Sequence, residues 1–219
     1  GENLAELFAQ SFSIHVDGWL NVLEATRSHA PTARVFYAAS SHVFGAPTEP
    51  LQNEDTPFRP NSAYGISKSA GVEVGRFFRA RGLHVSSGIL YNHESELRPA
   101  RFVTQRIVRG ALEAAAARRA GSAFVLELGS LSQVVDWGHA PDYTAAMQRI
   151  VEAAEADDYV VATGVPHTVA DFCAVAFAAL DLDAREFVVE RQGRLTRQLS
   201  PLVGDASRLR QRTGWAPTV

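Results

Sequence analysis

Strand-like runs alternate with segments of helical periodicity along this chain of 219 residues. β-rich or extended runs predict strands at 34–39, 84–91, 123–129 and 159–164. Apolar residues at helical spacing predict helices at 17–30, 63–81, 102–119, 142–156 and about 168–180, and a short one at 205–213. Such alternation is typical of a mainly parallel sheet. We therefore predict an α/β fold built on part of a doubly wound parallel sheet.

The first predicted strand ends in a polar turn, Ser40-Ser41-His42, and a long loop follows at 45–62. Loops longer than about 12–15 residues in compact domains are usually functional or disordered. In open α/β sheets, ligands bind in the crevice at the carboxyl ends of the strands. We expect Ser40 to face such a crevice; the alternative is a simple turn serine.

Tyr64 and Lys68 form a Y-x-x-x-K pattern at the start of the predicted helix 63–81, and Lys68 is the only lysine beside 20 arginines. Residues i and i+4 share a helix face, so an ammonium lies near a phenol. A nearby cation favours phenolate and makes tyrosine a usable general acid/base. We predict that Ser40 orients a substrate oxygen, Tyr64 transfers its proton and Lys68 tunes Tyr64. The alternative is an accidental surface pair.

Several separated segments carry a resemblance to a known family. They are A-S-S-H-V-F-G at 39–45, T-P-F-R-P-N-S-A-Y-G at 56–65, G-I-L-Y-N-H-E-S at 88–95, F-V-T at 102–104 and D-W-G-H-A-P-D-Y at 136–143. In this order they resemble the extended short-chain dehydrogenase/reductases, and among these GDP-mannose 4,6-dehydratase. The similarity continues through A-T-G at 162–164, G-D at 204–205 and G-W at 214–215. It covers essentially the whole chain and about the last two thirds of such an enzyme.

The resemblance implies a partial Rossmann-type sheet with a small C-terminal α/β substrate lobe. Residues 1–95 would form the C-terminal part of the Rossmann-type domain and carry the catalytic residues. Residues 96–219 would mainly form the nucleotide-sugar-binding lobe, with some segments returning to the Rossmann-type domain. A glycine-rich G-x-G-x-x-G turn after a strand, which cradles a pyrophosphate, is not found. We therefore expect that this chain alone does not bind NADP tightly.

The resemblance also implies a reaction. NADP, with NAD as the other option, would be a recycled cofactor: hydride leaves sugar C4, water is eliminated across C5 and C6, and hydride returns to C6. By the same match, Lys68 would hold the cofactor ribose, and His93 and Arg98 would contact NADP. Contacts to the nucleotide-sugar, a GDP-sugar by preference, would come from Asn92, Val103, Arg106 and Arg197. Arginine forks suit a diphosphate.

Two positions depart from the family pattern. His42 stands where the family has a glutamate that removes the C5 proton, and Val135 replaces an arginine that contacts the GDP-sugar. Histidine can act as a base near pH 7, so His42 joins the candidate catalytic residues. A nucleotide-sugar epimerase or 4-ketoreductase, which needs only Ser40, Tyr64 and Lys68, is one alternative. A non-catalytic, truncated or divergent domain is another.

Composition sets further expectations. A net charge of −3 gives no reason to expect nucleic acid or an anionic membrane as a partner. No signal peptide and no apolar run near the roughly 20 residues of a membrane span are found, so a cytoplasmic protein is expected. The seven histidines show no paired ligand spacing, which predicts no metal site. We expect Cys173 to be a buried thiol, and the protein to form a homodimer or higher homo-oligomer.

Overall fold

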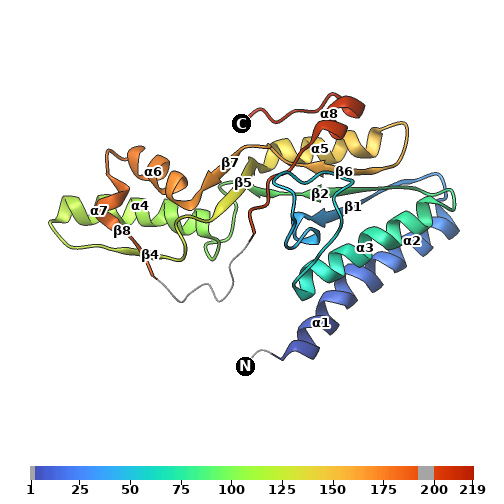
Figure 1. The fold of residues 1–219 in the computed structure, drawn as a ribbon, viewed down its shortest axis with the longest axis horizontal. Helices are drawn as coiled ribbons and strands as arrows, with labels where there is room; N and C mark the ends of the chain where they lie inside the picture. Colours follow the sequence, from blue (N-terminus) through green and yellow to red (C-terminus); the bar gives the residue numbers. More distant parts are fainter. Residues whose placement is uncertain (1–2, 192–199) are drawn as a thin grey trace. The chain divides into compact units, whose positions relative to one another are not determined.

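A computed structural model describes residues 3–191 and 200–219. The chain divides into two compact units, each described by itself. The first consists of Gly1–His93, Asp136–Gly164 and Leu202–Val219, and the second of Glu94–Val135 and Val165–Pro201. The ribbon in Figure 1 follows the chain through both.

The first unit is built on a parallel sheet in the order β1-β2-β6. Its strands are β1 (Arg34–Ser40), β2 (His84–Leu90) and β6 (Asp158–Val161). Its helices are α1 (Leu4–Phe12), α2 (Gly18–His29), α3 (Ala63–Arg79), α5 (Ala140–Glu152) and α8 (Ser207–Thr213). In Figure 1, α2 and α3 lie on one side of this sheet and α5 on the other. Helices on both faces of a parallel sheet confirm the predicted α/β fold.

Burial of the sheet explains why β2 reads as a continuous apolar and small-residue run. Six consecutive residues of β2, from Val85 to Leu90, are buried. A parallel strand covered on both faces has no solvent face, so alternation disappears. Residues from several elements complete this core, among them Leu23, Val72, Ile89, Tyr143, Ile150, Val160 and Leu209, each fully buried. The helices are thereby fixed to the sheet.

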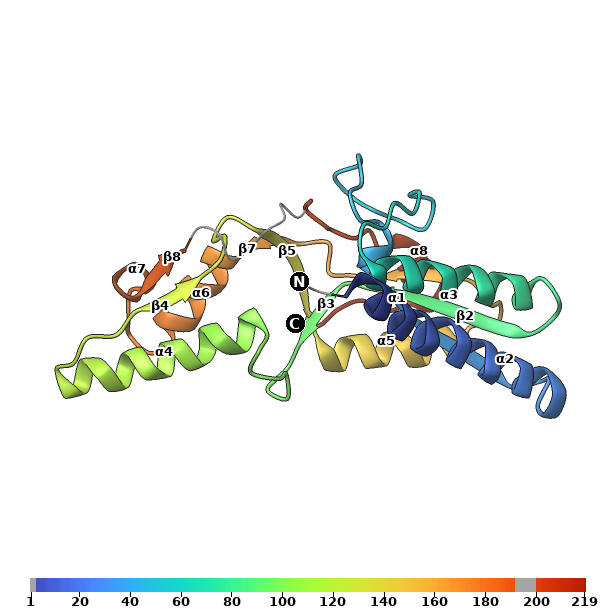
Figure 2. The same cartoon turned by 90° about the horizontal axis from the view of Figure 1, so that it is seen from below.

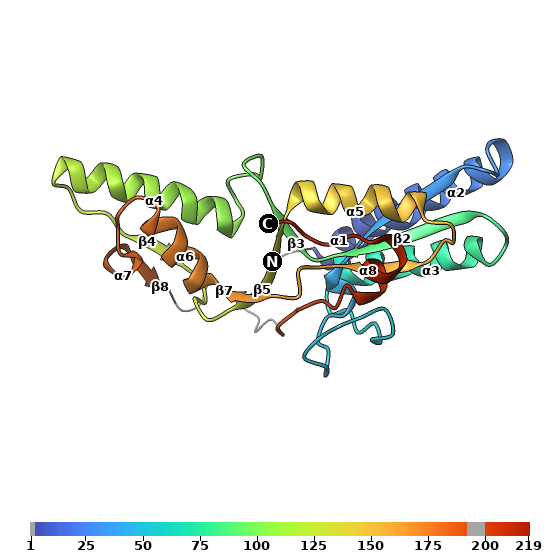
Figure 3. The ribbon, with the colours of Figure 1, turned by 90° about the horizontal axis from the view of Figure 1, so that it is seen from above.

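The second unit packs helices on a small parallel pair of strands. Its elements are α4 (Val103–Ala120), β4 (Leu126–Leu128), β7 (Pro166–Thr168), α6 (Val169–Ala178), α7 (Ala184–Phe187) and β8 (Val188–Glu190), of which β4 and β8 pair in parallel. Figure 3 shows α4 running beside α6. Thr168 and Asp171 form the predicted capping box at the start of α6. Cys173 is buried as expected, and burial raises the pKa of its thiol to about 11.

Some elements lack a sequence signal. β3 (Asn92–Glu94) and β5 (Val134–His139) lie where the chain passes from one unit to the other, and neither was predicted. Neither were β7, β8 and α7. Four of these elements, β3, β7, β8 and α7, are three or four residues long and too short to display a period of 2 or 3.6. β5 has six residues, but V-V-D-W-G-H does not alternate between apolar and polar residues. Between α1 and α2 the chain forms a π-helical turn, Ser13–Asp17, which was also not predicted.

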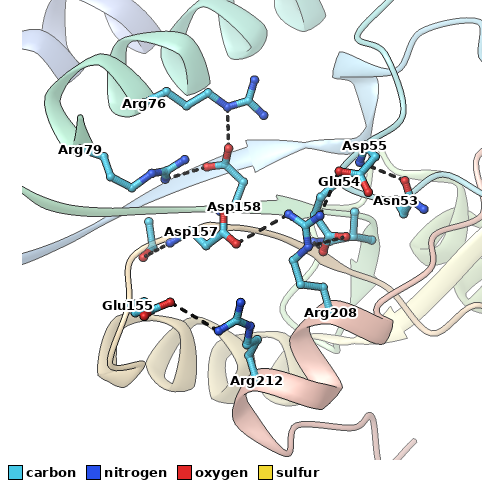
Figure 4. Close-up of polar contacts among 12 residues, drawn as sticks. Asn53, Glu54, Asp55, Arg76, Arg79, Glu155, Asp157, Asp158, Arg208 and Arg212 are labelled. Carbon is cyan, nitrogen blue, oxygen red and sulfur yellow. Dashed lines mark hydrogen bonds and ion pairs between the residues drawn. The ribbon is translucent and has the colours of Figure 1, made fainter.

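The long loop that precedes α3 is held by Gln52 and Glu54. The backbone of Gln52 donates to Val203 O (2.9 Å) and accepts from Asp205 N (2.8 Å), while its buried side chain accepts from the Tyr91 hydroxyl at 3.0 Å. Glu54 accepts a hydrogen bond from the backbone N–H of Val160 at 2.8 Å. Arg208 of α8 lies between Glu54, Asp55 and Asp157 (Figure 4). The loop is thus tied to β6 and to the C-terminal segment.

A buried carboxylate fixes the far end of α3. Asp158, at the start of β6, accepts from Arg76 Nε at 2.6 Å and from Arg79 Nη1 at 3.0 Å, and its side chain is 4% exposed (Figure 4). Arg79 also donates to Val85 O in β2. Burial alone would raise the pKa of Asp158, but the hydrogen bonds and charges of Arg79 and Arg76 hold that pKa below its ordinary value. The ion pairs tie α3 to β6, and the hydrogen bond from Arg79 to Val85 ties it to β2.

Replacing Asp158 by Asn leaves Arg79 without its counter-charge and Arg76 with only its ion pair to the exposed Glu73. Because Arg76 is about one third exposed and partly hydrated, we expect a loss of about 2 kcal/mol, below the roughly 3–5 kcal/mol of a fully buried pair. Because the pKa of Asp158 is lowered in the folded state, its ion pairs add to the free energy of unfolding above the ordinary aspartate pKa. This contribution is lost as the pH falls through the lower folded-state pKa. Urea unfolding at pH 7 and in acid should therefore show a smaller pH dependence in the variant.

The matched control is Glu155→Gln, since Glu155 and Arg212 form an ion pair that is 81% and 58% exposed. Exposed pairs contribute little, so this variant should unfold like wild type. Equal stability of Asp158→Asn and Glu155→Gln at pH 7 would contradict the role given to Asp158.

Candidate active site

The carboxyl end of β1 places Ser40 and His42 together. Ser40 is the last residue of β1 and is 8% exposed. Its hydroxyl oxygen accepts a hydrogen bond from the backbone N–H of His42 at 3.3 Å, which caps the 3₁₀ turn Ser41–Val43. Because Ser40 Oγ is the acceptor in this bond, its own proton remains to be donated elsewhere. His42 is exposed.

The start of α3 approaches that turn closely. Ser62 is the N-cap and accepts from the backbone N–H of Gly65 at 3.1 Å. A Cβ atom at Gly65 would lie 2.6 Å from the carbonyl oxygen of His42, so a larger residue would push the helix away. Tyr64 is therefore held beside His42, with ring centroids 5.7 Å apart at 83°. The Tyr64 side chain stays 41% exposed, accessible to a ligand.

Lys68 lies one turn further along α3. Its Nζ donates to the carbonyl oxygen of Ala38 in β1 at 2.8 Å, and lies 5.8 Å from the centroid of the Tyr64 ring and 5.1 Å from that of Tyr37. Burial lowers the pKa of the Lys68 ammonium. The structure thus places Ser40 at the end of β1, and Tyr64 and Lys68 on the first two turns of α3. Their catalytic roles stay predictions.

His15, which the sequence interpretation missed, also contacts Tyr64. Their ring centroids lie 5.2 Å apart at 81°, and His15 Nδ1 is 2.8 Å from the hydroxyl oxygen of Ser67. His15 belongs to the π-helical turn, 49 residues before Tyr64. No spacing rule links positions that far apart, so only the fold reveals the contact.

Asn92 and His93 follow the carboxyl end of β2. Asn92 is exposed, and His93 is half-buried with its ring stacked on Tyr143 at 4.6 Å. His93 Nδ1 lies 2.8 Å from the carbonyl oxygen of Tyr91. A carbonyl only accepts, so Nδ1 carries the proton in the neutral ring and Nε2 is an acceptor. This fixed orientation is consistent with the predicted ligand contact.

The segment after β6 is fixed by Asp136, from the D-W-G-H motif. One of its oxygens accepts from Thr163 N (3.0 Å) and Oγ1 (2.6 Å), the other from Gly164 N (2.9 Å) and Gly204 N (3.1 Å). Asp136 is fully buried. Burial, and after it the charge of Asp136, raises the pKa of the Tyr143 hydroxyl above its ordinary value. Asp136 thereby shapes the polar end of the sheet without facing solvent.

The remaining predicted contacts belong to the second unit. Arg98 Nε lies 3.2 Å from Glu94, and the Arg98 guanidinium lies 3.6 Å from the centroid of the Phe102 ring. Val103 is the first residue of α4 and is half-buried. Arg106 donates to the carbonyl oxygen of Glu127 at 2.8 Å. Arg197 lies outside the described residues. The ligand roles of these residues stay predictions.

The described part of the chain holds neither a metal-ligand cluster nor a helix that could span a membrane. No group of three or more His, Cys, Asp or Glu side chains there could hold a metal ion. No helix within residues 3–191 and 200–219 is long and apolar enough to cross a membrane.

A three-stranded parallel sheet with helices on both faces, a serine at the end of β1 and Tyr-x-x-x-Lys on α3 are typical of the short-chain dehydrogenase/reductases. The profile of one family, GDP-mannose 4,6 dehydratase, matches residues 8–219. The chain belongs to this family.

Individual proteins of this family are also similar to the chain. The chain is 40% identical to GDP-mannose 4,6 dehydratase 2 of Arabidopsis thaliana over 208 residues, which is 92% of this chain and 54% of the relative. It is 37% identical to GDP-mannose 4,6-dehydratase of Sinorhizobium fredii over 219 residues, which is 90% of this chain and 61% of the relative. The chain thus spans somewhat more than half the length of these curated relatives.

Solved structures share the fold. RMD from Pseudomonas aeruginosa complexed with NADPH has a TM-score of 0.81 at 22% identity, covering 100% of this chain and 74% of that one. dTDP-glucose 4,6-dehydratase from Bacillus anthracis in complex with NAD has a TM-score of 0.82 at 18% identity, covering 95% of this chain and 64% of that one. At these identities the likeness shows the fold.

Replacing Asp136 by Asn tests whether this carboxylate fixes the segment after β6. In Asn, an NH₂ group replaces one of the two carboxylate oxygens of Asp136. Two buried donors that now bond to that oxygen would then face another donor and lack an acceptor. We expect a loss of about 3 kcal/mol in the free energy of unfolding, measured by urea denaturation. Asp55→Asn, at a carboxylate that is 81% exposed, is the control and should unfold like wild type. Equal stability of the two variants would show that Asp136 does not fix the segment after β6.

Proposed function

We propose that this chain supplies the proton-transfer and substrate-binding residues of an NADP-dependent nucleotide-sugar dehydratase that acts on a GDP-sugar. The observation that carries the proposal is the accessible Tyr64 phenol, with the Lys68 ammonium 5.8 Å from its ring centroid and Ser40 at the end of the neighbouring strand. The names of the relatives support GDP-mannose as substrate. The neighbouring structures are complexes with NADPH or NAD, which supports a nicotinamide cofactor.

The residues present suit such a cofactor. An ammonium has three N–H donors, and the carbonyl oxygen of Ala38 takes one from Lys68. We expect a ribose diol to take another, and His93 and Arg98 to contact the same cofactor. When bound, a nicotinamide would supply the hydride chemistry, with sugar C4 as the hydride donor and C6 as the acceptor. We expect the nucleotide-sugar to be contacted by Asn92, Val103, Arg106 and Arg197.

The chain's own residues handle the protons. Ser40 donates a hydrogen bond to the oxygen on C4, and Tyr64 takes the proton of the C4 hydroxyl while the hydride departs. Lys68 stabilises the phenolate form of Tyr64 that accepts this proton. His42 then removes the proton from C5, and the C6 hydroxyl leaves as water with the proton from Tyr64. Return of the hydride to C6 and of the proton from His42 to C5 completes the reaction, with one water lost.

His42 also motivates a second candidate. An imidazole differs from the family's glutamate in charge and reach, although it can accept a proton near pH 7. A nucleotide-sugar epimerase or 4-ketoreductase would use Ser40, Tyr64 and Lys68 alone. The edge contact between His42 and Tyr64 favours the dehydratase, since it places the imidazole next to the acid/base. A domain without turnover is the alternative from another class.

Tyr64→Phe should abolish the reaction. Assayed in an intact enzyme that also carries the glycine-rich turn, removal of the phenolic proton carrier should lower turnover of GDP-mannose with NADP by at least about 100-fold. Tm should change little because Tyr64 is exposed. Product is measured by NMR. Tyr159→Phe, at a buried tyrosine of β6, is the control and should keep wild-type turnover. Full activity of Tyr64→Phe would refute the mechanism, and a wild-type protein without turnover would favour the non-catalytic alternative.

His42→Ala should separate hydride transfer from dehydration. In deuterium oxide, the wild type should place deuterium at C5 and release water. The variant should still oxidise C4 while losing C5 exchange by about 100-fold, and His42→Glu should restore the exchange. If His42→Ala exchanged C5 as wild type does, His42 would not be the base. If the wild type oxidised C4 but kept the C6 oxygen, the epimerase or reductase would replace the dehydratase.

A further inference from the structure

The segment before the catalytic helix contains an irregular turn. α1, the π-helical turn Ser13–Asp17 and α2 follow one another as one continuous helical stretch (Figure 2). A π-turn inserts one extra residue into a helix, and such turns occur frequently at functional sites. Here the middle of the turn is His15. His15 contacts Tyr64 and Ser67 of α3.

His15 is held by contacts to β1 and α3. Its carbonyl oxygen accepts from the hydroxyl of Tyr37 in β1 at 3.2 Å. Its Nδ1 lies 2.8 Å from Ser67 Oγ, and its ring meets the Tyr64 ring edge-on at 5.2 Å. Tyr37 also lies under the ammonium of Lys68, 5.1 Å from the ring centroid. The backbone and the ring of one residue are thus both tied to neighbours of the Tyr64–Lys68 pair.

The hydrogen bonds define the form of the imidazole. The Ser67 hydroxyl has one proton, which it donates to the carbonyl oxygen of Tyr64 at 3.0 Å. Ser67 Oγ must therefore accept from His15, so His15 Nδ1 carries a proton. Burial, and after it the positive charge of Lys68, lowers the pKa of His15. The ring is neutral at pH 7, with its lone pair on Nε2.

Tyr64 contacts two imidazoles. His15 and His42 meet its ring nearly perpendicularly, at 81° and 83°. Edge-to-face contacts between aromatic rings are directional. The two histidines have different surroundings, since His42 is exposed whereas His15 is half-buried and hydrogen-bonded to Ser67. The hydrogen bond to Ser67 therefore fixes the His15 ring beside Tyr64.

We propose that His15 is a positioning residue: its imidazole, locked by the hydroxyl of Ser67, holds the Tyr64 ring in the orientation needed for proton transfer. The reaction itself rests on the function proposed above, whereas the orientation of Tyr64 does not. An apolar packing residue would supply the ring contact without the hydrogen bond to Ser67. The titratable groups that face His15 are Tyr64 and Lys68 of α3 and Tyr37 of β1.

NMR of the protein tests the locked imidazole without any substrate. We expect the wild-type His15 ring to show the Nδ1–H form, to titrate below the ordinary histidine value, and to give nuclear Overhauser contacts with the Tyr64 ring. Ser67→Ala should shift the ring toward the Nε2–H form and weaken those contacts at least twofold. Exposed His29, at the end of α2, is the internal control. An Nε2–H form of wild-type His15, or a His15 pKa that is not below the ordinary histidine value, overturns the proposal.

Turnover tests the consequence for Tyr64. His15→Phe keeps a ring but loses the donor to Ser67, and we expect its kcat to fall about tenfold with KM unchanged, because misplacing a reacting group slows the chemical step. His15→Asn, which keeps a donor of similar reach, should recover part of that loss. His29→Asn should behave as wild type. A kcat for His15→Phe within twofold of wild type overturns the proposal.

The two readouts separate failure of this proposal from failure of the proposed function. If the wild type turned over no nucleotide-sugar, the proposed function would fail, while the NMR contacts between His15 and Tyr64 would still decide the positioning role. Weakening of those contacts in Ser67→Ala would then support that role. Unchanged contacts in Ser67→Ala would overturn it.

Discussion

The close approach of α3 to β1 is the constraint on which the site depends. A Cβ atom at Gly71 would lie 2.0 Å from the hydroxyl oxygen of Tyr37, and one at Gly65 would lie 2.6 Å from the carbonyl oxygen of His42. Two glycines one and a half turns apart therefore let the helix lie directly on the end of the sheet. Tyr64 and Lys68 reach their partners only because of this approach. The chemistry of the site is set by helix packing before any ligand arrives.

Charge pairing secures the opposite end of the same helix. Asp158 binds Arg76 and Arg79, and so joins the last turn of α3 to β6. Breaking a buried pair costs more than forming it contributes, because the remaining charge loses its partner. The helix is thus fixed at one end by steric fit and at the other by ion pairs. Such double anchoring keeps functional groups within the small tolerances that proton transfer demands.

The sequence predicts long elements and local pairs well. The helix that carries Tyr64 and Lys68 follows from apolar periodicity, and their proximity follows from an i,i+4 spacing that any helix imposes. The position of Ser40 follows from the rule for strand ends. His15 could not be found, because its contact with Tyr64 depends on a π-turn and on tertiary packing. Asp136 was seen only as part of a motif, since its four hydrogen bonds join segments distant in sequence.

The anchored ammonium of Lys68 has a consequence for chemical labelling. It is the only side-chain amine in the sequence, and burial lowers its pKa, so a larger fraction is uncharged and nucleophilic at a given pH than for an ordinary lysine. Reductive methylation with ¹³C-formaldehyde would therefore place a single side-chain label on α3, distinguishable from the α-amine by its shift. Lys68 thus offers a single labelling position for NMR at the carboxyl edge of the sheet, without an engineered cysteine.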